Sequence, residues 1–374
     1  MRTASYRTMA LTGAMGAILM LATVASAAGP QERQLISPSQ KAPESPAVSV
    51  PTDMVYVPWG SFTMGMDRPP SKAVAAKPMT ARERLTKRSW SAEAFFDEGP
   101  AHTVVLDSYF FDKFETSNAL FGAFLKATGH PAPAYWDDPR LNRPEQPVVG
   151  VNYNDAKAFC EWKGKRLPTE AEWEKAARGP KGYRYPWGDT FDAAKANYGK
   201  QLTSTLPVDS LPEGESFYGA RHMAGNVFEW VADWYHTDYL PSMTAMANPQ
   251  GPEKGAYIGA TGTYIDRLAT GVKRVIRGGS WIAPQGSVTT THRFWNDQMN
   301  NSYGVGLGVR CAQNAPQEID QQVREAHVRT LVSMGKEDYA AAGQSLAEGL
   351  KLDPTNEDLL QLREQIRKTA SGSK

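Results

Sequence analysis

The sequence predicts a mixed α+β domain with little regular secondary structure, followed by a small all-α tail. Residues 180–214 contain short apolar runs separated by Gly, Pro, Asn and Asp, a pattern typical of short strands joined by turns. Two helix starts with capping signals precede that stretch. From Pro316 onward Trp is absent, and Ala, Leu, Glu and Gln dominate. We therefore expect two main helices with small irregular sheets in the first part, and packed helices in the second.

Length and composition limit the possible classes of protein. The 374 residues suffice for one large domain and a smaller module. The formal net charge is +1, so no strong field attracts nucleic acid, and we expect no nucleic-acid partner. Ten Trp, 15 Tyr and 32 Gly fit a loop-rich globular domain with aromatic packing.

Residues 1–27 have the pattern of a secretory signal peptide. Arg2 and Arg7 give a positively charged start, residues 9–24 form an apolar run, and small residues follow it up to Ala27. We expect cleavage after Ala27, which makes the mature chain periplasmic or secreted; a retained N-terminal anchor is the alternative. No later apolar segment is long enough to span a bilayer, so we expect no membrane span in the mature chain.

The segment before the main helices contains a linker, two strands and an insertion. Residues 28–53 are rich in Pro, Ser and Gln, which predicts a disordered linker. Residues 54–65 alternate apolar residues with turn formers and predict a hairpin of short strands. Residues 67–90 then carry seven Lys or Arg in a segment that is long for a loop. We interpret this basic insertion as a solvated excursion or, alternatively, as a docking arm for an acidic or phosphate-bearing partner.

The two main helices are predicted by their caps. Asn154 and Asp155 are expected to cap a helix with an apolar buried face. Thr169 is the predicted N-cap of the next helix, with Glu172 closing a capping box. The acids near this second start are Glu170, Glu172 and Glu174. Capping and the helix dipole account for them, which disfavours a paired-carboxylate catalytic site.

The tail, residues 316–369, predicts three amphipathic helices. A Tyr-Ala-Ala sequence at 339–341 and Leu-Asp-Pro-Thr-Asn at 352–356 make it resemble one tetratricopeptide repeat with a capping helix. One such repeat cannot bury a continuous core by itself. We therefore expect the tail to pack on the main domain, to dimerise or to dock a protein partner.

Five further segments follow one another over about one domain length. They read GKRLPTEAEWEKAARG (164–179), RYPWGD (184–189), HMAGNVFEWVADWY (222–235), RVIRGGSW (274–281) and GVGLGVRC (304–311). Together they resemble the formylglycine-generating-enzyme or sulfatase-modifying-factor family over residues 54–313. The resemblance implies a fold related to C-type lectins. It also implies a disulfide between Cys160 and Cys311, which export favours as well; two buried free thiols are the alternative.

The same resemblance exposes a missing site. Family members that make formylglycine bind copper(I) with two cysteines, placed two and seven residues after the Trp of RGGSW, because thiolates suit a soft ion. Here those positions are Ala283 and Val288, and neither side chain coordinates a metal. We therefore expect no copper and no copper oxidase activity.

The resemblance also implies structural calcium, a cation that takes oxygen ligands. Its predicted ligands at one site are the backbone of Gly225 and Val227 and the carboxylate of Glu229, with His222 replacing the amide that the family uses. A second site would begin at Asn197 and Tyr198, although its other half is shortened here.

The region after RGGSW lines the substrate groove in the family. The resemblance makes these residues groove candidates for an extended peptide or a planar ligand: Ser280, Trp281, His292, Arg293, Trp295 and Asn296. Core packing and salt bridging by the same residues is the alternative.

Two classes of function follow. The first is an exported family member without the oxidase site, a pseudoenzyme that binds a protein or peptide through the groove and the tail or acts as an accessory maturation factor. The second is a periplasmic oxidoreductase or maturation enzyme that uses a different metal or none. A transition metal held by residues such as His222, His236 or His292 would indicate the second class. The sequence specifies neither the substrate nor the oligomeric state.

Overall fold

The computed structural model describes residues 49–67, 97–236, 239–242, 247–253, 273–299 and 304–372, which all lie in one compact unit. The predicted signal peptide lies outside the described residues. So do most of the predicted linker and, apart from Asp67, the basic insertion.

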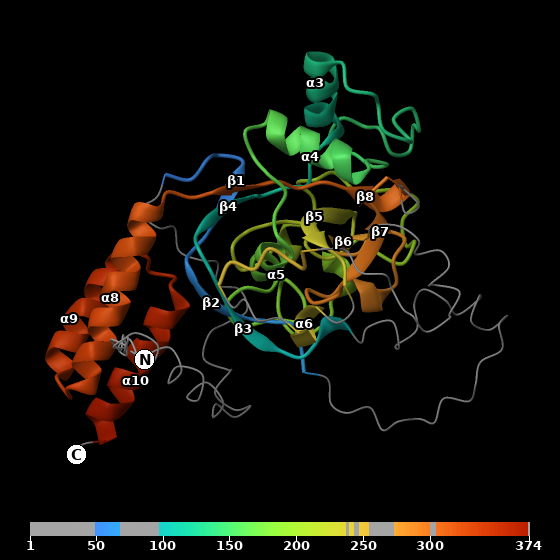
Figure 1. Cartoon of the computed structure of the whole chain (residues 1–374). Helices are drawn as coiled ribbons and strands as arrows, with labels where there is room; N and C mark the ends of the chain where they lie inside the picture. The colour runs from blue at the N-terminus through green and yellow to red at the C-terminus, as the bar shows by residue number, and fades with distance from the viewer. Residues whose placement is uncertain are drawn as a thin grey trace, which may run out of the picture. The chain divides into compact units, whose positions relative to one another are not determined.

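Three small sheets build the described part of the main domain (Figure 1). In the first, β4 (Tyr109–Asp112) pairs antiparallel with both β1 (Met54–Val57) and β9 (Ala312–Asn314). The second is the antiparallel pair of β2 (Gly60–Met64) and β3 (His102–Leu106). The third has the order β7-β6-β5-β8, comprising β7 (Phe294–Asp297), β6 (Lys273–Arg277), β5 (Phe228–Trp234) and β8 (Leu307–Gly308).

Helices cover these sheets. The main domain contains three helices of similar length where two were expected, α3 (Asn118–Thr128), α4 (Tyr153–Trp162) and α5 (Glu170–Arg178), besides the short α6 (Tyr239–Ser242). Short 3-10 turns lie at Ala193–Lys195, Pro212–Gly214, Gln285–Ser287 and Gly304–Gly306. The predicted capping box of α5 is confirmed: Thr169 and Glu172 each bond the other's backbone N–H.

The four-stranded sheet separates two hydrophobic cores, because alternate side chains of a strand point to opposite faces. Val231 and Val275 join the core that contains Trp173 of α5. Trp230 and Ile276 join the other core, which includes the aromatic residues of α3 and α4. The disulfide between Cys160 and Cys311 is present in this second core, which confirms the predicted pairing.

Two local predictions are corrected. Residues 54–65 do not form a hairpin, because β1 pairs with β4 whereas β2 pairs with β3. The turn between β1 and β2 is fixed instead by Lys175, whose Nζ donates to the carbonyls of Pro58 (2.7 Å) and Gly60 (2.9 Å). The N-cap of α4 is Asn152, and Asp155 is the third helical residue of its capping box.

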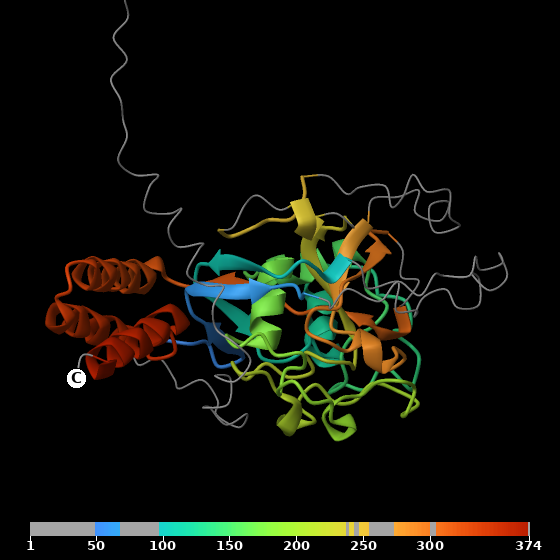
Figure 2. The ribbon, with the colours of Figure 1, turned by 90° about the horizontal axis from the view of Figure 1, so that it is seen from below.

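The tail forms three helices, as predicted: α8 (Gln317–Gly335), α9 (Tyr339–Leu352) and α10 (Glu357–Gly372). They form one group in Figure 2 and share a core of Val323, Leu346, Leu359 and Leu362. Hydrogen bonds join this group to the main domain, for example from the Ser108 N–H to Asp320 at 2.7 Å. Packing on the main domain, one of the three outcomes expected for the tail, is thus observed, whereas dimerisation and docking of a partner stay predictions.

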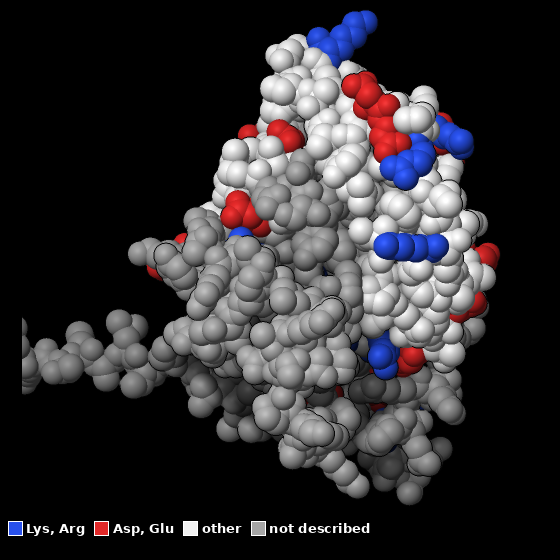
Figure 3. Space-filling view, turned by 90° about the vertical axis from the view of Figure 1, so that its right-hand side faces the viewer, with Lys and Arg blue, Asp and Glu red and all other residues white. Residues whose placement is uncertain are grey.

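Within the described part of the chain, no helix is both long and apolar enough to cross a membrane. Acidic and basic side chains are interspersed on the described part of the face in Figure 3. That mixture agrees with the formal net charge of +1.

Candidate functional site

The RGGSW turn follows β6 and packs closely against the loop that comes after it. Gly278 (φ +95°) and Gly279 (φ +76°) adopt left-handed conformations, which favour glycine. A Cβ on Gly279 would lie 2.6 Å from the Ser287 carbonyl oxygen, so only glycine allows this approach. The turn thereby brings Ser280, Ala283 and Val288 into the interior, whereas Gln285 and Gly286 between them stay exposed.

The two positions that the family resemblance assigns to copper-binding cysteines hold apolar, buried side chains. Ala283 and Val288 are both fully buried, and Val288 packs in a cluster with Tyr185 and Trp187. The chain contains two cysteines, and both are in the disulfide. No thiol is therefore available as a ligand for copper(I).

Most of the predicted groove residues are buried. Ser280, Trp281, His292, Arg293 and Asn296 belong to the interior, and the Trp281 Nε1–H donates to the Val305 carbonyl at 2.7 Å. The partly exposed candidate is Trp295, whose ring packs against Tyr235 and lies 5.1 Å from the Lys273 ammonium. Trp295 is thus the candidate that still fits a surface groove.

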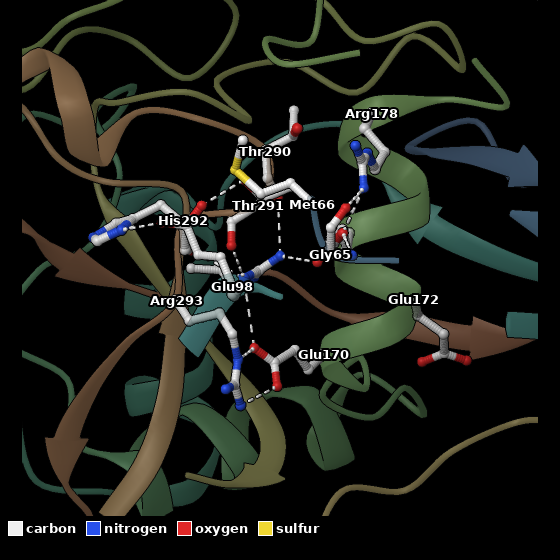
Figure 4. A network of polar contacts seen from close by, with 12 residues as sticks. Gly65, Met66, Glu98, Glu170, Glu172, Arg178, Thr290, Thr291, His292 and Arg293 are labelled. Atoms are coloured by element: carbon white, nitrogen blue, oxygen red, sulfur yellow. Dashed lines mark hydrogen bonds and ion pairs between the residues drawn. The ribbon is translucent and has the colours of Figure 1, made fainter. Parts of the chain in front are cut away.

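A buried ionic network lies between α5, the end of β6 and the segment that leads into β7 (Figure 4). Arg293 forms a two-pronged pair with Glu170, at 2.7 and 2.9 Å. Arg277 binds Glu174 at 2.6 Å and lies 3.5 Å from Glu170. Glu174 also accepts from Arg178 at 2.9 Å. All five side chains are buried, so each charge depends on its partner.

The network continues to the residues that follow the RGGSW turn. Arg277 also donates to the backbone carbonyls of Thr290, Thr291 and His292. The Thr291 hydroxyl donates to Glu98 at 2.8 Å, and the His292 ring nitrogen Nδ1 lies 3.4 Å from the same carboxylate. This corrects the expectation that Arg293 and His292 line a groove: the structure assigns them to core salt bridging, the alternative interpretation.

Burial and the neighbouring charges shift the pKa values of two carboxyl groups at the start of α5, Glu170 and Asp233. Burial opposes ionisation of Glu170, but the charges of Arg293 and Arg277 outweigh it and lower its pKa. Asp233 accepts the Glu170 backbone N–H at 2.7 Å and so caps the start of α5. Burial and then the Glu170 charge raise the pKa of Asp233 to about 8.

Replacing Asp233 with Asn should weaken the pH dependence of stability. An unfolded Asp has a pKa of about 3.9, whereas Asp233 has a folded pKa of about 8. Between these values the folded chain holds a proton that the unfolded chain releases. Stability from this group is therefore complete below the unfolded pKa and is lost as pH rises through the folded pKa.

The measurement is urea denaturation of both proteins at pH 6 and pH 9. We expect the wild type to lose stability relative to Asp233→Asn as the pH rises. Asp138→Asn is the control, because Arg140 lowers the Asp138 pKa to about 2, outside this range. Parallel pH profiles for wild type and Asp233→Asn would contradict the assignment.

The residues around Gly225 do not fit a calcium ion. Glu229 is buried; the Arg310 guanidinium donates to both of its oxygens (2.7–3.0 Å) and the Trp173 indole N–H to one (2.7 Å). A cation thus already neutralises the one carboxylate of the predicted set. The Val227 N–H points to Glu115, whose pKa burial raises well above the ordinary value.

Asn197 fits a calcium ligand better. Its Nδ2 donates to the Ser204 carbonyl and to Asn226, whereas its Oδ1 is buried and makes no hydrogen bond within the described residues. A buried amide oxygen of this kind suits an oxygen-coordinated cation. The neighbouring Tyr198 is partly buried against Phe191.

The histidines considered for a transition metal are not gathered together. Burial, followed by the Arg310 charge, lowers the pKa of His222 to about 3, and its Nε2 lies 3.2 Å from the Pro207 carbonyl oxygen. Among the described residues, no group of three or more His, Cys, Asp or Glu side chains is arranged to hold a metal ion.

Sequence reasoning missed the role of Glu170, Glu174 and Asp233. The capping signal at Thr169 explained the acids locally, and it holds for Glu172. For the other acids, the sequence offered a different signal, namely two arginines, Arg277 and Arg293, in apolar surroundings. Such arginines need buried carboxylates as partners.

Comparison with known proteins agrees with the fold. The sulfatase-modifying factor enzyme 1-like domain matches residues 39–315. The formylglycine-generating enzyme of Thermomonospora curvata is 32% identical over 327 residues, covering 69% of this chain and 92% of that enzyme. The structure of PvdO from Pseudomonas aeruginosa superposes with a TM-score of 0.52 at 27% identity, covering 73% of this chain and 100% of that one.

A third relative is much longer than the matched region. The serine/threonine-protein kinase pkn1 of Chlamydia pneumoniae is 36% identical over 245 residues, which cover 60% of this chain and 36% of the kinase. The chain therefore spans about a third of that relative's length.

The fold, the RGGSW turn and the disulfide are those of a domain of the sulfatase-modifying class. Three helices follow this domain in the chain. With the match over residues 39–315, the chain belongs to the sulfatase-modifying factor enzyme 1-like family, which includes formylglycine-generating enzymes.

Proposed function

We propose that this chain is an exported family member without copper oxidase activity, which binds a protein or peptide as an accessory maturation factor. One observation carries the proposal: Ala283 and Val288 fill the copper-ligand positions, and both cysteines are in the disulfide. The scaffold remains while the redox ligands are gone. We therefore expect the chain to bind a protein or peptide but not to oxidise it.

The tail supports a binding role. Val328 and Val332 lie one turn apart on α8 and are 56% and 51% exposed. Neighbouring exposed apolar side chains of this kind mark protein contact surfaces more often than isolated ones do. Trp295 supplies a second, partly exposed contact on the main domain.

Copper uptake tests the proposal. The full chain, exported and purified without chelators, should retain no copper after reconstitution with copper(I). The variant Ala283→Cys/Val288→Cys should gain about one equivalent, because two thiolates suit the soft ion. The same elemental analysis tests calcium at Asn197, and the mass of the mature chain tests cleavage after Ala27.

Two results would contradict the proposal. One equivalent of a transition metal in the wild type, retained through gel filtration, would favour the oxidoreductase alternative. The binding role would be excluded if the exported chain showed oxidase activity and cross-linking captured no protein. A captured protein with no bound transition metal would support it.

A further inference from the structure

A polar groove lies where the main domain meets the first turn of the tail. Its volume is about 620 Å³, within the roughly 300–1,000 Å³ that ligand sites occupy. α4, the start of α5, the β3–β4 turn, the end of β9 and the first residue of α8 line it. Most of its lining side chains carry amide, hydroxyl or charged groups, among them Asp107, Arg166, Thr169, Asn248, Asn314 and Gln317. The groove therefore suits a polar ligand.

The edge strand of the first sheet borders this polar groove. In the order β1-β4-β9, one side of β9 has no neighbour among the described strands. The Asp112 N–H donates to the Cys311 carbonyl at 2.9 Å. Because successive residues of a strand direct their backbone groups to opposite sides, Ala312 and Asn314 present theirs away from β4. Ala312 agrees with this geometry, since it exchanges two hydrogen bonds with Arg166, at 2.7 and 2.9 Å.

The position opposite Asn314 on the same edge is open. Gly164 and Lys165 would continue the pairing that Arg166 begins, but their N–H groups donate instead to carbonyls at the end of α4. Asn314 is exposed, and its backbone N–H and C=O make no hydrogen bond with another described residue. An unpaired donor and acceptor on a strand edge are the groups to which an added strand bonds.

Three amide side chains of the groove are fixed at one end only. The Asn248 Oδ1 accepts the Asp107 N–H at 2.8 Å. The Gln250 amide donates to the Asn248 carbonyl at 3.0 Å, and the Gln317 amide donates to the Ala315 carbonyl at 3.1 Å. Within the described residues, the Asn248 NH2 group and both glutamine Oε1 atoms make no hydrogen bond. Together they offer further donors and acceptors at fixed positions.

The charged side chains of the groove already have partners. The Lys157 ammonium lies 2.5 Å from the Glu161 carboxylate, one turn away on α4. Arg166 donates to both oxygens of Glu172, at 2.7 and 2.6 Å. Asp107 pairs with an arginine of α8. An ionic ligand would have to compete with these pairs, so the groove favours an uncharged ligand.

We propose that the polar groove binds an extended, uncharged peptide segment of a partner protein, with one peptide residue opposite Asn314. This site rests on the proposed binding function and specifies the conformation of the bound partner. A residue in extended conformation carries the N–H and C=O that the edge requires, as Arg166 does opposite Ala312. The hydroxyls of a neutral sugar suit the amide side chains but do not reproduce this backbone pair. The tail takes part in binding, because Gln317 of α8 lines the groove.

The test uses the full exported chain and a pool of acetylated heptapeptide amides made from Ser, Thr, Ala, Val and Gln. Retained peptides are identified by mass spectrometry, and the strongest is titrated by calorimetry. We expect one equivalent to bind. Methylation of one central peptide nitrogen should weaken binding about tenfold, because it removes a backbone donor. Methylation of the last peptide nitrogen is the control and should have little effect.

A protein variant locates the bound peptide. Gln317→Ala should weaken the strongest peptide about threefold to tenfold, since it removes one acceptor from the groove. Gln321→Ala is the matched control, because this glutamine lies one turn further along α8, outside the groove, and its amide donates to Glu325. Circular dichroism checks that both variants are folded. Equal affinities for the two variants would contradict the assignment.

The outcomes separate this site from the proposed function. A peptide that binds but responds neither to central methylation nor to Gln317→Ala would leave the binding function standing and overturn the groove assignment alone. Retention of neutral oligosaccharides such as maltoheptaose, with no peptide retained, would assign the groove to sugars instead. No retained ligand of either kind would also overturn the inference, whereas cross-linking tests the proposed function independently.

Discussion

Replacing Arg277 with Ala should lower the free energy of unfolding by about 3–5 kcal/mol, the cost of leaving buried charges without their partner. Arg277 is fully buried, and its guanidinium binds Glu174 at 2.6 Å and lies 3.5 Å from Glu170. It also supplies donors to three backbone carbonyls between Thr290 and His292. Urea denaturation followed by tryptophan fluorescence measures the loss.

Two controls separate this network from general effects of removing an arginine. Arg140→Ala removes a partner of Asp138 on the exposed surface and should leave the urea midpoint unchanged. Arg277→Lys should lose part of the stability, because Lys keeps the charge but cannot reach several acceptors at once. If Arg277→Ala proved no more damaging than Arg140→Ala, the network would not stabilise the fold as described.

Local signals predicted the helices well, because their causes lie within a few residues. The capping box of Thr169 and Glu172 is encoded over four positions, and the structure shows it in full. The three tail helices follow from apolar periodicity in the same way. Family resemblance, carried by five segments, supplied the sheet-poor α+β fold and the disulfide pairing that local signals alone do not specify.

The buried network could not be predicted in this way. Glu174 bonds Arg277 and the Gly65 N–H, which lie 103 and 109 residues away in sequence. Because Arg293 lies close to RGGSW in the sequence, it was predicted to line a groove. In the fold, its guanidinium pairs instead with the carboxylate of Glu170 on α5. The hairpin expected at 54–65 failed for a similar reason: Lys175, remote in sequence, fixes the intervening turn.

The wild type should lose about 4–5 kcal/mol of stability when its disulfide is removed, the entropy of closing so long a loop in the unfolded chain. Cys160 on α4 and Cys311 just before β9 are separated by 151 residues, and both are fully buried. Cys160→Ser/Cys311→Ser tests this in urea. Reduction of the wild type should move its midpoint towards that of the variant.

The decisive comparison is the response to reductant. The double variant has no other cysteine, so reductant should leave its midpoint unchanged. Because the bond joins α4 to the segment that enters β9, its loss should affect the core shared by α3 and α4 and the four-stranded sheet. If wild type and double variant unfold at the same urea concentration, the disulfide does not stabilise the domain, and packing alone holds α4 in place.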